Sequence, residues 1–257
     1  MVNRLLLSAL FALTLILAPI TRAVIIDNPP DVAEEDIDVP NMTFKRMIVN
    51  KAAVKISTPS GGHGSGTLFK YKGHTIVITA AHVIDDDGVY VVETAEGSVT
   101  AKPVYFDELN DLGVLHVMED TMFSAIKHLR IKLRLADMVP GIGTDVYHSS
   151  FPADYTKQYF EGTIAGYERY EGAFYIIMNG WAWPGSSGSV VFNKKGQAVG
   201  IISAIDIRQI DPFYSPQALP SVVWLRPLSL IDKKILKQAL KDADVDEEAE
   251  TTPEETE

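Results

Sequence analysis

Short apolar runs, separated by Gly, Asp and Asn, recur along this chain from about residue 43 to residue 225. The runs are rich in Val, Ile, Thr, Tyr and Phe, which favour strands, and turn-forming residues interrupt them every few positions. Many short strands of this kind form an antiparallel barrel or sandwich. The sequence therefore predicts an all-β body, with strands that include residues 47–56, 66–71, 74–79, 89–93, 99–106, 112–118, 173–178, 190–192 and 198–203.

A single helix is expected after this body. Apolar residues recur there at the spacing of one helix face. Ser229 precedes them as a candidate N-cap, and Asp232 follows three residues later in a weak form of the capping box. We predict a helix over residues 229–241 that packs on the β body through Leu230, Ile231, Ile235, Leu236 and Leu240.

The N-terminal residues 1–23 have the pattern of an export signal. Arg4 precedes an apolar run over residues 5–20, and small residues stand near Ala23, where a signal peptidase would cut. The run is shorter than the ~20 residues of a spanning helix and Pro19 breaks its end, so cleavage is favoured over retention as an anchor. A secreted or periplasmic location follows, with membrane attachment only if this segment is retained.

Acidic residues are concentrated at the two ends of the remaining chain. Residues 24–42 contain six carboxylates and residues 242–257 contain nine, without any Lys or Arg, whereas residues 43–241 hold 19 acidic and 21 basic residues. We predict a disordered acidic linker and a disordered acidic tail, because like charges repel and few apolar groups could order them. Binding of a basic partner is the alternative. The near-neutral body has no basic patch interleaved with aromatic residues, which argues against a nucleic-acid ligand.

The chain contains no cysteine. Disulfides, thiolate metal sites and a cysteine nucleophile are therefore excluded. Five of the six histidines lack the paired short spacings of a zinc site, so no metal is predicted; they are His63, His74, His116, His128 and His148.

A first segment with catalytic potential is GSSGS, residues 185–189. Acyl transfer needs a hydroxyl on a tight turn and backbone N–H groups that converge on the developing oxyanion, and flanking glycines allow both. In isolation, such a string is more often an ordinary Ser/Gly turn.

A second segment is TAAHV, residues 79–83, which follows a predicted strand directly. The small alanines let the ring of His82 sit close to its neighbours, where it can take a proton from a serine and return it to a leaving amine. In isolation, a structural histidine at a strand end would be favoured.

A third segment is DLGVL, residues 111–115, in which an acid precedes a buried-looking strand. The Asp111 carboxylate could accept a hydrogen bond from an imidazole Nδ1 and stabilise the imidazolium. In isolation, an aspartate in a turn would be favoured.

Together, TAAHV, DLGVL and GSSGS resemble the active-site segments of the chymotrypsin-like (trypsin-like) serine peptidases, most closely the cysteine-poor HtrA-type branch. The order His, Asp, Ser is that of the family. Further similar segments extend the resemblance over residues 43–225; they are residues 64–69, 150–152, 160–166 and 196–203.

The resemblance implies two six-stranded antiparallel β-barrels, the first over residues 43–125 and the second over residues 143–228, joined by a connection at residues 126–142. His82 and Asp111 would come from the first barrel and Ser187 from the second. Only the helix and the acidic tail follow residue 225, and no PDZ-type module fits in that length.

The resemblance also implies the chemistry. Ser187 would attack the peptide carbonyl of a polypeptide substrate, His82 would act as base and then as acid, and Asp111 would orient His82. The backbone N–H groups of Gly185 and Ser187 would form the oxyanion hole, and no metal or organic cofactor is implied. Ser186 stands where zymogens of the family carry an aspartate that pairs with a newly cut N-terminus, so that activation switch is expected to be absent.

The primary specificity pocket would have walls at residues 180–184 and 203–205. Ile205 stands where the digestive relatives have a glycine and would narrow the pocket, so we predict a small or medium apolar side chain on the acyl side of the cut. A core role for the two tryptophans of these walls is favoured over a pocket role. The substrate-binding candidates are Trp181, Ala182, Trp183, Pro184, Ser203, Ala204 and Ile205.

Two functions therefore compete. The first is a serine endopeptidase with His82, Asp111 and Ser187 as its triad. The alternative is a catalytically silent peptide-binding scaffold on the same fold, since a fold does not determine an activity. The presence of all three triad residues favours the enzyme, because a binding module has no need of that combination.

Overall fold

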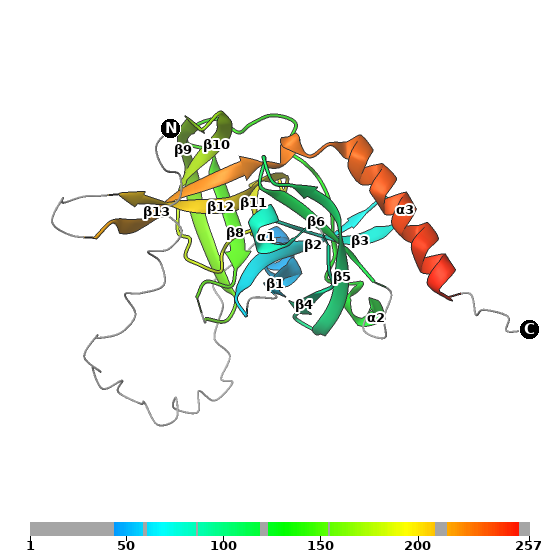
Figure 1. Cartoon of the computed structure of the whole chain (residues 1–257). Coiled ribbons are helices and arrows are strands. Elements are labelled where there is room, and N and C mark those ends of the chain that lie inside the picture. Colours follow the sequence, from blue (N-terminus) through cyan, green and yellow to red (C-terminus); the bar gives the residue numbers. More distant parts are fainter. Residues whose placement is uncertain are drawn as a thin grey trace, which may run out of the picture. The chain divides into compact units, whose positions relative to one another are not determined.

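A computed structural model describes residues 44–58, 61–85, 87–118, 123–153, 155–208 and 215–251 of the chain. Residues 42–257 form one compact unit, in which two groups of strands lie next to each other (Figure 1). The predicted export signal and acidic linker lie outside the described residues. None of the helices in the described part combines the length and the apolar character needed to span a bilayer.

The first group of strands is an antiparallel barrel. Its strands follow the order β1-β4-β5-β6-β3-β2, and pairing of β2 with β1 closes the ring. A short strand, β7 (Ile131–Lys132), adds to β2 in parallel. The six barrel strands are β1 (Ala53–Ser57), β2 (His63–Tyr71), β3 (His74–Thr79), β4 (Tyr90–Thr94), β5 (Gly97–Asp107) and β6 (Leu112–Val117).

The second group is a closed barrel with the strand order β10-β13-β12-β11-β8-β9, antiparallel throughout. The predicted architecture of two six-stranded antiparallel barrels is thus confirmed. The strands are β8 (Asp145–Ser150), β9 (Gln158–Tyr170), β10 (Ala173–Asn179), β11 (Val190–Asn193), β12 (Ala198–Arg208) and β13 (Gln217–Pro227).

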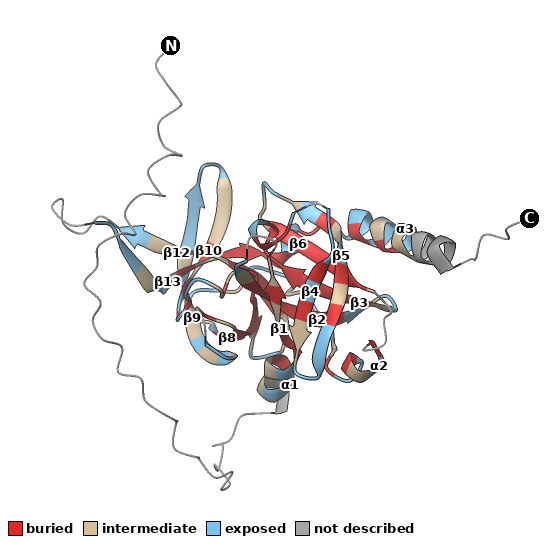
Figure 2. Cartoon of the chain, turned by 60° about the horizontal axis from the view of Figure 1, so that its bottom comes forward, coloured by how far each residue is buried: buried red, intermediate tan, exposed pale blue. Residues whose placement is uncertain are grey.

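The main hydrophobic core joins the two barrels. Buried residues are concentrated in the strands of the first barrel (Figure 2). The same core cluster includes Tyr147 of β8 and Phe192 of β11, and the ring of Phe192 packs 6.1 Å from that of Phe69 in β2. Because this packing crosses from one barrel to the other, segments of both barrels are held in fixed positions at their interface.

Helices occupy the ends of the body and the connections. These are α1 (Phe44–Ala52), η1 (Ala81–Val83), α2 (Phe123–Ile126), η2 (Leu228–Leu230) and α3 (Lys233–Thr251). The predicted C-terminal helix is confirmed, and Ile231, Leu236 and Leu240 belong to the main core. Leu230 and Ile235, which were also predicted to pack on the β body, are exposed instead.

Two predictions about local structure were wrong. The predicted strand over residues 47–56 is mostly the helix α1, and only its end belongs to β1; an apolar run that also contains Lys and Ala suits either element. The C-terminal helix begins later than residue 229 and continues to Thr251, into the stretch predicted to be disordered, where Ala and Glu are good helix formers. Its cap is Asp232 and not Ser229, because Asp232 Oδ1 accepts the N–H of Lys234 at 2.8 Å.

Candidate active site

Two neighbouring strands of the first barrel bring His82 and Asp111 together. His82 lies in η1, just after β3, and Asp111 immediately precedes β6; β3 and β6 pair so that Thr79 is opposite Gly113. His82 Nδ1 is 2.9 Å from Asp111 Oδ1 and 3.0 Å from Oδ2, and the backbone N–H of His82 donates to Oδ1 at 3.0 Å. The predicted histidine–aspartate pair is therefore formed.

This pair fixes which ring nitrogen of His82 faces the carboxylate. Burial raises the pKa of Asp111, but the hydrogen bonds and charge of His82, with a further hydrogen bond from Ser203, outweigh it, so this pKa lies below its ordinary value. An ionised carboxylate only accepts hydrogen bonds, so His82 Nδ1–H is the donor to Asp111. The His82 side chain is 47% exposed.

Ser203 has a role that the sequence did not predict. It was a candidate wall of the specificity pocket, but its Oγ donates to Asp111 Oδ2 at 2.5 Å. The register between β12 and β13 shifts between Ile202 and Ala204, which leaves Ser203 as an extra residue in β12. Such an irregularity changes the direction in which a side chain points, and no pattern in the sequence predicted it.

The loop that carries Ser187 lies against the segment that leads to His82. A Cβ added to Gly188, whose φ is +84°, would come within 2.7 Å of Ala80 N and 2.1 Å of Thr79 Oγ1. Only glycine allows this approach of the backbone. Ser187 is half-buried. Within the described residues, no hydrogen bond joins its Oγ to His82, although such bonds often tighten only when substrate binds.

Backbone donors of the 185–189 loop separate into two groups. The N–H groups of Ser186, Gly188 and Ser189 donate to Trp183 O, Ile202 O and Ser186 O at 2.8, 2.8 and 3.1 Å. In contrast, the N–H groups of Gly185 and Ser187 have no acceptor in the described part of the chain. These are the two donors predicted for the oxyanion hole, and both residues are half-buried.

The residue before Ser187 is Ser186, which has a neutral hydroxyl. Ser186 is fully buried, and its Oγ accepts the N–H of Trp183 at 3.2 Å and the hydroxyl of Ser150 at 3.1 Å. Zymogens of the resembling family carry a charged aspartate here, whereas this chain satisfies the buried position with local hydrogen bonds alone.

The interpretation of Trp181 and Trp183 as core residues was wrong, since their exposed fractions are 56% and 44%. They flank a cavity of about 740 Å³ between their segment and the β8–β9 loop. The other predicted walls, Pro184, Ser203, Ala204 and Ile205, do not line this cavity. The lining residues are Pro152, Ala153, Tyr155, Gln158, Phe160, Trp181, Ala182 and Trp183.

The buried side chain of His148 contacts two of the residues that line this cavity. His148 of β8 is 0% exposed, its Nε2–H donates to Trp181 O at 3.0 Å, and its ring stacks on Phe160 with centroids 5.1 Å apart. Burial lowers the pKa of His148 to about 4, because a charged imidazolium would lose its hydration there. The sequence offered no sign of this role.

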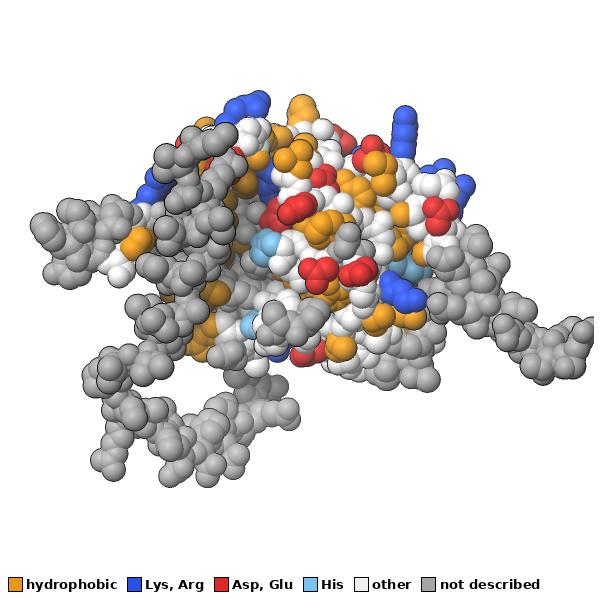
Figure 3. All heavy atoms as spheres, in the orientation of Figure 1, with side chains coloured by type: hydrophobic (Ala, Val, Ile, Leu, Met, Phe, Trp, Pro, Cys, Tyr) orange, Lys and Arg blue, Asp and Glu red, His pale blue; other side chains and the backbone are white. Residues whose placement is uncertain are grey.

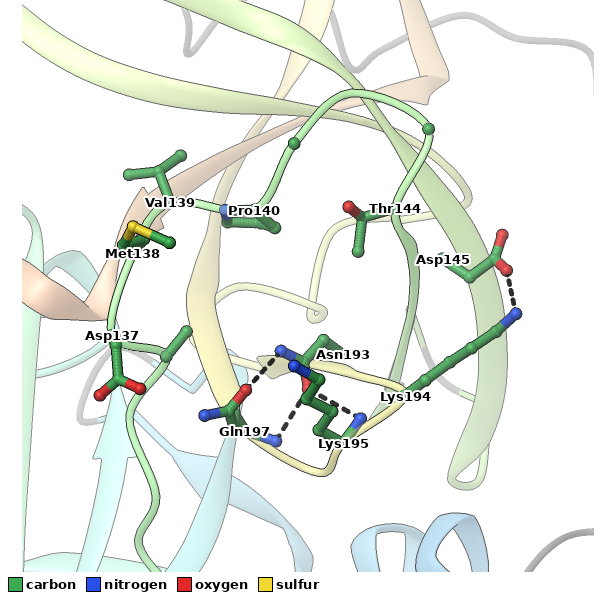
Figure 4. A pocket seen from close by; sticks show the side chains of 13 residues that line it. Asp137, Met138, Val139, Pro140, Thr144, Asp145, Asn193, Lys194, Lys195 and Gln197 are labelled. Carbon is green, nitrogen blue, oxygen red and sulfur yellow. Dashed lines mark hydrogen bonds and ion pairs between the residues drawn. The ribbon is translucent and has the colours of Figure 1, made fainter.

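A second cavity, of about 560 Å³, lies between the inter-barrel connection and the β11–β12 turn (Figure 4). Asn193 Nδ2 donates to Gln197 Oε1 at 3.0 Å across its floor, and Lys194 pairs with Asp145 at its edge (Figure 4). None of the predicted catalytic or substrate-binding residues lines it.

Two further features of the described residues are their surface charge and their metal-binding groups. On the face shown in Figure 3, acidic, basic and apolar side chains are interspersed wherever grey atoms do not cover them. Within the described ranges, no three His, Asp or Glu side chains cluster as they would to hold a metal ion.

The trypsin-like peptidase domain family model matches residues 64–201. Over 154 residues the chain is 30% identical to the serine protease Do-like HtrA of Bacillus subtilis, and over 155 residues it is 26% identical to serine protease HtrA-like of Staphylococcus aureus. Each match covers 55% of this chain but only 33% and 20% of those proteins, so the chain matches a third or less of their length.

Solved structures agree in fold. The serine endoprotease from Yersinia pestis superposes with a TM-score of 0.58 at 20% identity, covering 77% of this chain and 66% of that one. The Rv3671c protease in its inactive form gives a TM-score of 0.58 at 16% identity, covering 75% and 91%.

Proposed function

Because the chain belongs to the trypsin-like peptidase domain family, we propose that it is a serine endopeptidase that cleaves polypeptides through an acyl-enzyme. Ser187 is the nucleophile, His82 the general base and acid, and Asp111 the carboxylate that orients and stabilises the imidazolium. The observation that carries the proposal is the pair of unpaired N–H groups, Gly185 and Ser187, in a loop whose other N–H groups are all bonded.

In the first step, Ser187 Oγ attacks the carbonyl carbon of the scissile bond while its proton passes to His82 Nε2. The carbonyl oxygen becomes an oxyanion that accepts hydrogen bonds from the two free N–H groups. His82 then gives this proton to the leaving amine as the C–N bond breaks. A water molecule repeats the sequence on the ester, releasing the acid and restoring the Ser187 hydroxyl.

Exposed aromatic residues give a basis for substrate preference. Trp181 and Trp183 stand four and two residues before Gly185. Together with Tyr155 they line the cavity of about 740 Å³. We propose that this cavity receives a large apolar side chain near the scissile bond, because exposed aromatic rings gain most by burying such a group. Pro184, Ala204 and Ile205 remain proposed walls of a separate, narrower pocket for a small or medium apolar side chain.

Export is part of the same proposal. The leader predicted for residues 1–23 would deliver the enzyme outside the cytoplasm. N-terminal sequencing of the protein recovered from an exporting host tests this point: a chain that starts near residue 24 supports it, and an intact leader on cytoplasmic protein contradicts it.

The decisive experiment is labelling with a fluorophosphonate probe, which reacts only with an activated serine. The expected result is labelling of the full chain and none of Ser187→Ala, with both proteins giving the same thermal unfolding curve. A well-folded but unlabelled full chain would instead support the silent peptide-binding scaffold, for which the absence of a Ser187–His82 hydrogen bond is the motivating observation.

A further inference from the structure

Ser65 of β2 is a fully buried serine that connects two loops of the opposite barrel. Its side chain is 0% exposed. Its Oγ accepts the backbone N–H of Phe151, in the β8–β9 loop, at 2.9 Å, and donates to the carbonyl of Gly185 at 2.7 Å. One hydroxyl thus uses its single proton and a lone pair to hold both loops.

The backbone of Ser65 takes part in the same arrangement. Its N–H donates to Ser187 O at 2.7 Å, and its own carbonyl accepts the hydroxyl of Thr79, at the end of β3, at 2.8 Å. Ser65 is therefore anchored within the first barrel, while it binds the carbonyls of Gly185 and Ser187 on either side of Ser186.

Each peptide unit is planar, with the C=O of one residue opposed to the N–H of the next, so the free N–H of Gly185 shares its plane with the carbonyl of Pro184. The Pro184 carbonyl accepts the N–H of Ala153 at 2.6 Å, which turns the Gly185 N–H to the other side. Ala153 belongs to the loop that Ser65 holds through Phe151. The Ser65 hydroxyl thus holds the peptide plane after Gly185 directly, and it holds the plane before Gly185 through the loop that contains Phe151 and Ala153.

The surroundings of Gly185 leave little room for another arrangement. Its φ is +95°, and a Cβ there would come within 2.5 Å of Phe151 O and 2.6 Å of His63 Nε2. His63 Nε2 and Phe151 O are themselves 2.8 Å apart in a hydrogen bond. Gly185 is thus enclosed by the groups that Ser65 and His63 fix in place.

We propose that Ser65 is a positioning residue that aligns the oxyanion-hole N–H of Gly185 from the opposite barrel. Ser65 does not touch substrate; it acts through Gly185 and Phe151. The inference rests on the proposed function and assigns to this serine a role in transition-state binding that goes beyond packing.

The test compares Ser65→Ala with the full wild-type chain. We expect kcat to fall about 10- to 100-fold with little change in KM, somewhat less than the 10²–10³ of deleting an oxyanion donor itself. Affinity for a peptidyl aldehyde inhibitor, whose hemiacetal oxyanion occupies the hole, should fall by the same factor.

A matched control separates positioning from stability. Thr75 at the start of β3 is also buried, and its hydroxyl accepts a hydrogen bond from Arg130 Nη1 at 2.6 Å, at the end of β3 away from Thr79. Thr75→Val should lower the melting temperature while kcat and aldehyde affinity stay at the wild-type values. Should Ser65→Ala fail to fold, Ser65→Thr and Ser65→Val provide a pair of equal shape, of which only Thr retains the hydroxyl and should retain kcat.

The inference is overturned if hydroxyl-free variants of Ser65 keep wild-type kcat and aldehyde affinity. Amide hydrogen exchange of the 183–189 segment provides a readout that needs no catalysis: it should rise in Ser65→Ala and not in Thr75→Val. An unlabelled wild type with this exchange pattern would refute the peptidase proposal alone, whereas a labelled wild type without it would refute the role of Ser65 alone.

Discussion

Acid should destabilise this fold through one buried side chain, His148. The pKa of His148 is about 4 in the folded chain, against 6.5 for an unperturbed histidine. Below pH 6.5 the unfolded chain binds a proton at this residue before the folded chain does, so the free energy of unfolding falls as pH is lowered. The loss begins near pH 6.5 and is complete near pH 4.

The magnitude follows from the size of this shift. At 1.36 kcal/mol per pKa unit, lowering from 6.5 to about 4 corresponds to a loss of about 3 kcal/mol of stability at pH 4. A typical domain has only about 5–15 kcal/mol in total, so a loss of this size is readily measured.

The assay is urea unfolding at several pH values between 7 and 4, for wild type and for His148→Gln. Glutamine does not titrate and retains an amide N–H that can donate to Trp181 O. Its curve of unfolding free energy against pH should therefore be flatter than the wild-type curve by about 3 kcal/mol over this interval. Carboxylates such as Asp111 contribute to both proteins and cancel in the difference.

An exposed histidine provides the control. The side chain of His128 is 60% exposed and pairs with Glu96 at 3.3 Å, so His128→Gln removes one histidine from the chain without removing a buried one. Parallel curves for wild type and His148→Gln would refute the argument, because they would mean that folding does not change proton binding at the buried ring.

Two further predictions concern the support of Asp111. Ser203→Ala removes the hydroxyl donor to Asp111, so kcat/KM should fall about tenfold, the equivalent of one hydrogen bond of about 1.4 kcal/mol to a charged group, with a fall in melting temperature of only a few degrees; an unaltered kcat/KM in steady-state assays would contradict this. Arg226 of β13 is buried and donates to Asn110 O and Leu109 O at 2.7 and 3.0 Å, so Arg226→Met should lower the free energy of unfolding by about 3 kcal/mol, because both hydrogen bonds come from a charged donor and are lost together. Chemical denaturation measures this loss, and a loss below about 1 kcal/mol would show that the carbonyls find other partners.

The local sequence predicted the barrel strands and the candidate catalytic segments, but not the contacts that bring these segments together. The strand over residues 74–79 was predicted with the bounds that β3 has, because its β-branched residues and flanking turns agree. The role of Ser203 depends on a register shift in β12, and the role of Ser65 depends on a neighbour 120 residues away. Neither is written in a local pattern.

The same limit explains why Trp181 and Trp183 were wrongly predicted to be core residues. Trp181 and Trp183 are large apolar residues next to an apolar strand, and composition alone favours their burial. Their exposure depends on where the β8–β9 loop stands, which the buried bond from His148 to Trp181 O helps to fix. That arrangement could not be predicted from the positions of these residues along the chain.

Each barrel holds a catalytic segment of the other. From the first barrel, Ser65 binds the carbonyls of Gly185 and Ser187. From the second barrel, Ser203 binds the carboxylate of Asp111 and Arg226 binds the carbonyl just before it. Because each set of bonds requires the partner barrel to be folded and docked, we expect that neither barrel alone would keep the geometry of its proposed catalytic residues, and that the proposed site forms only together with the interface.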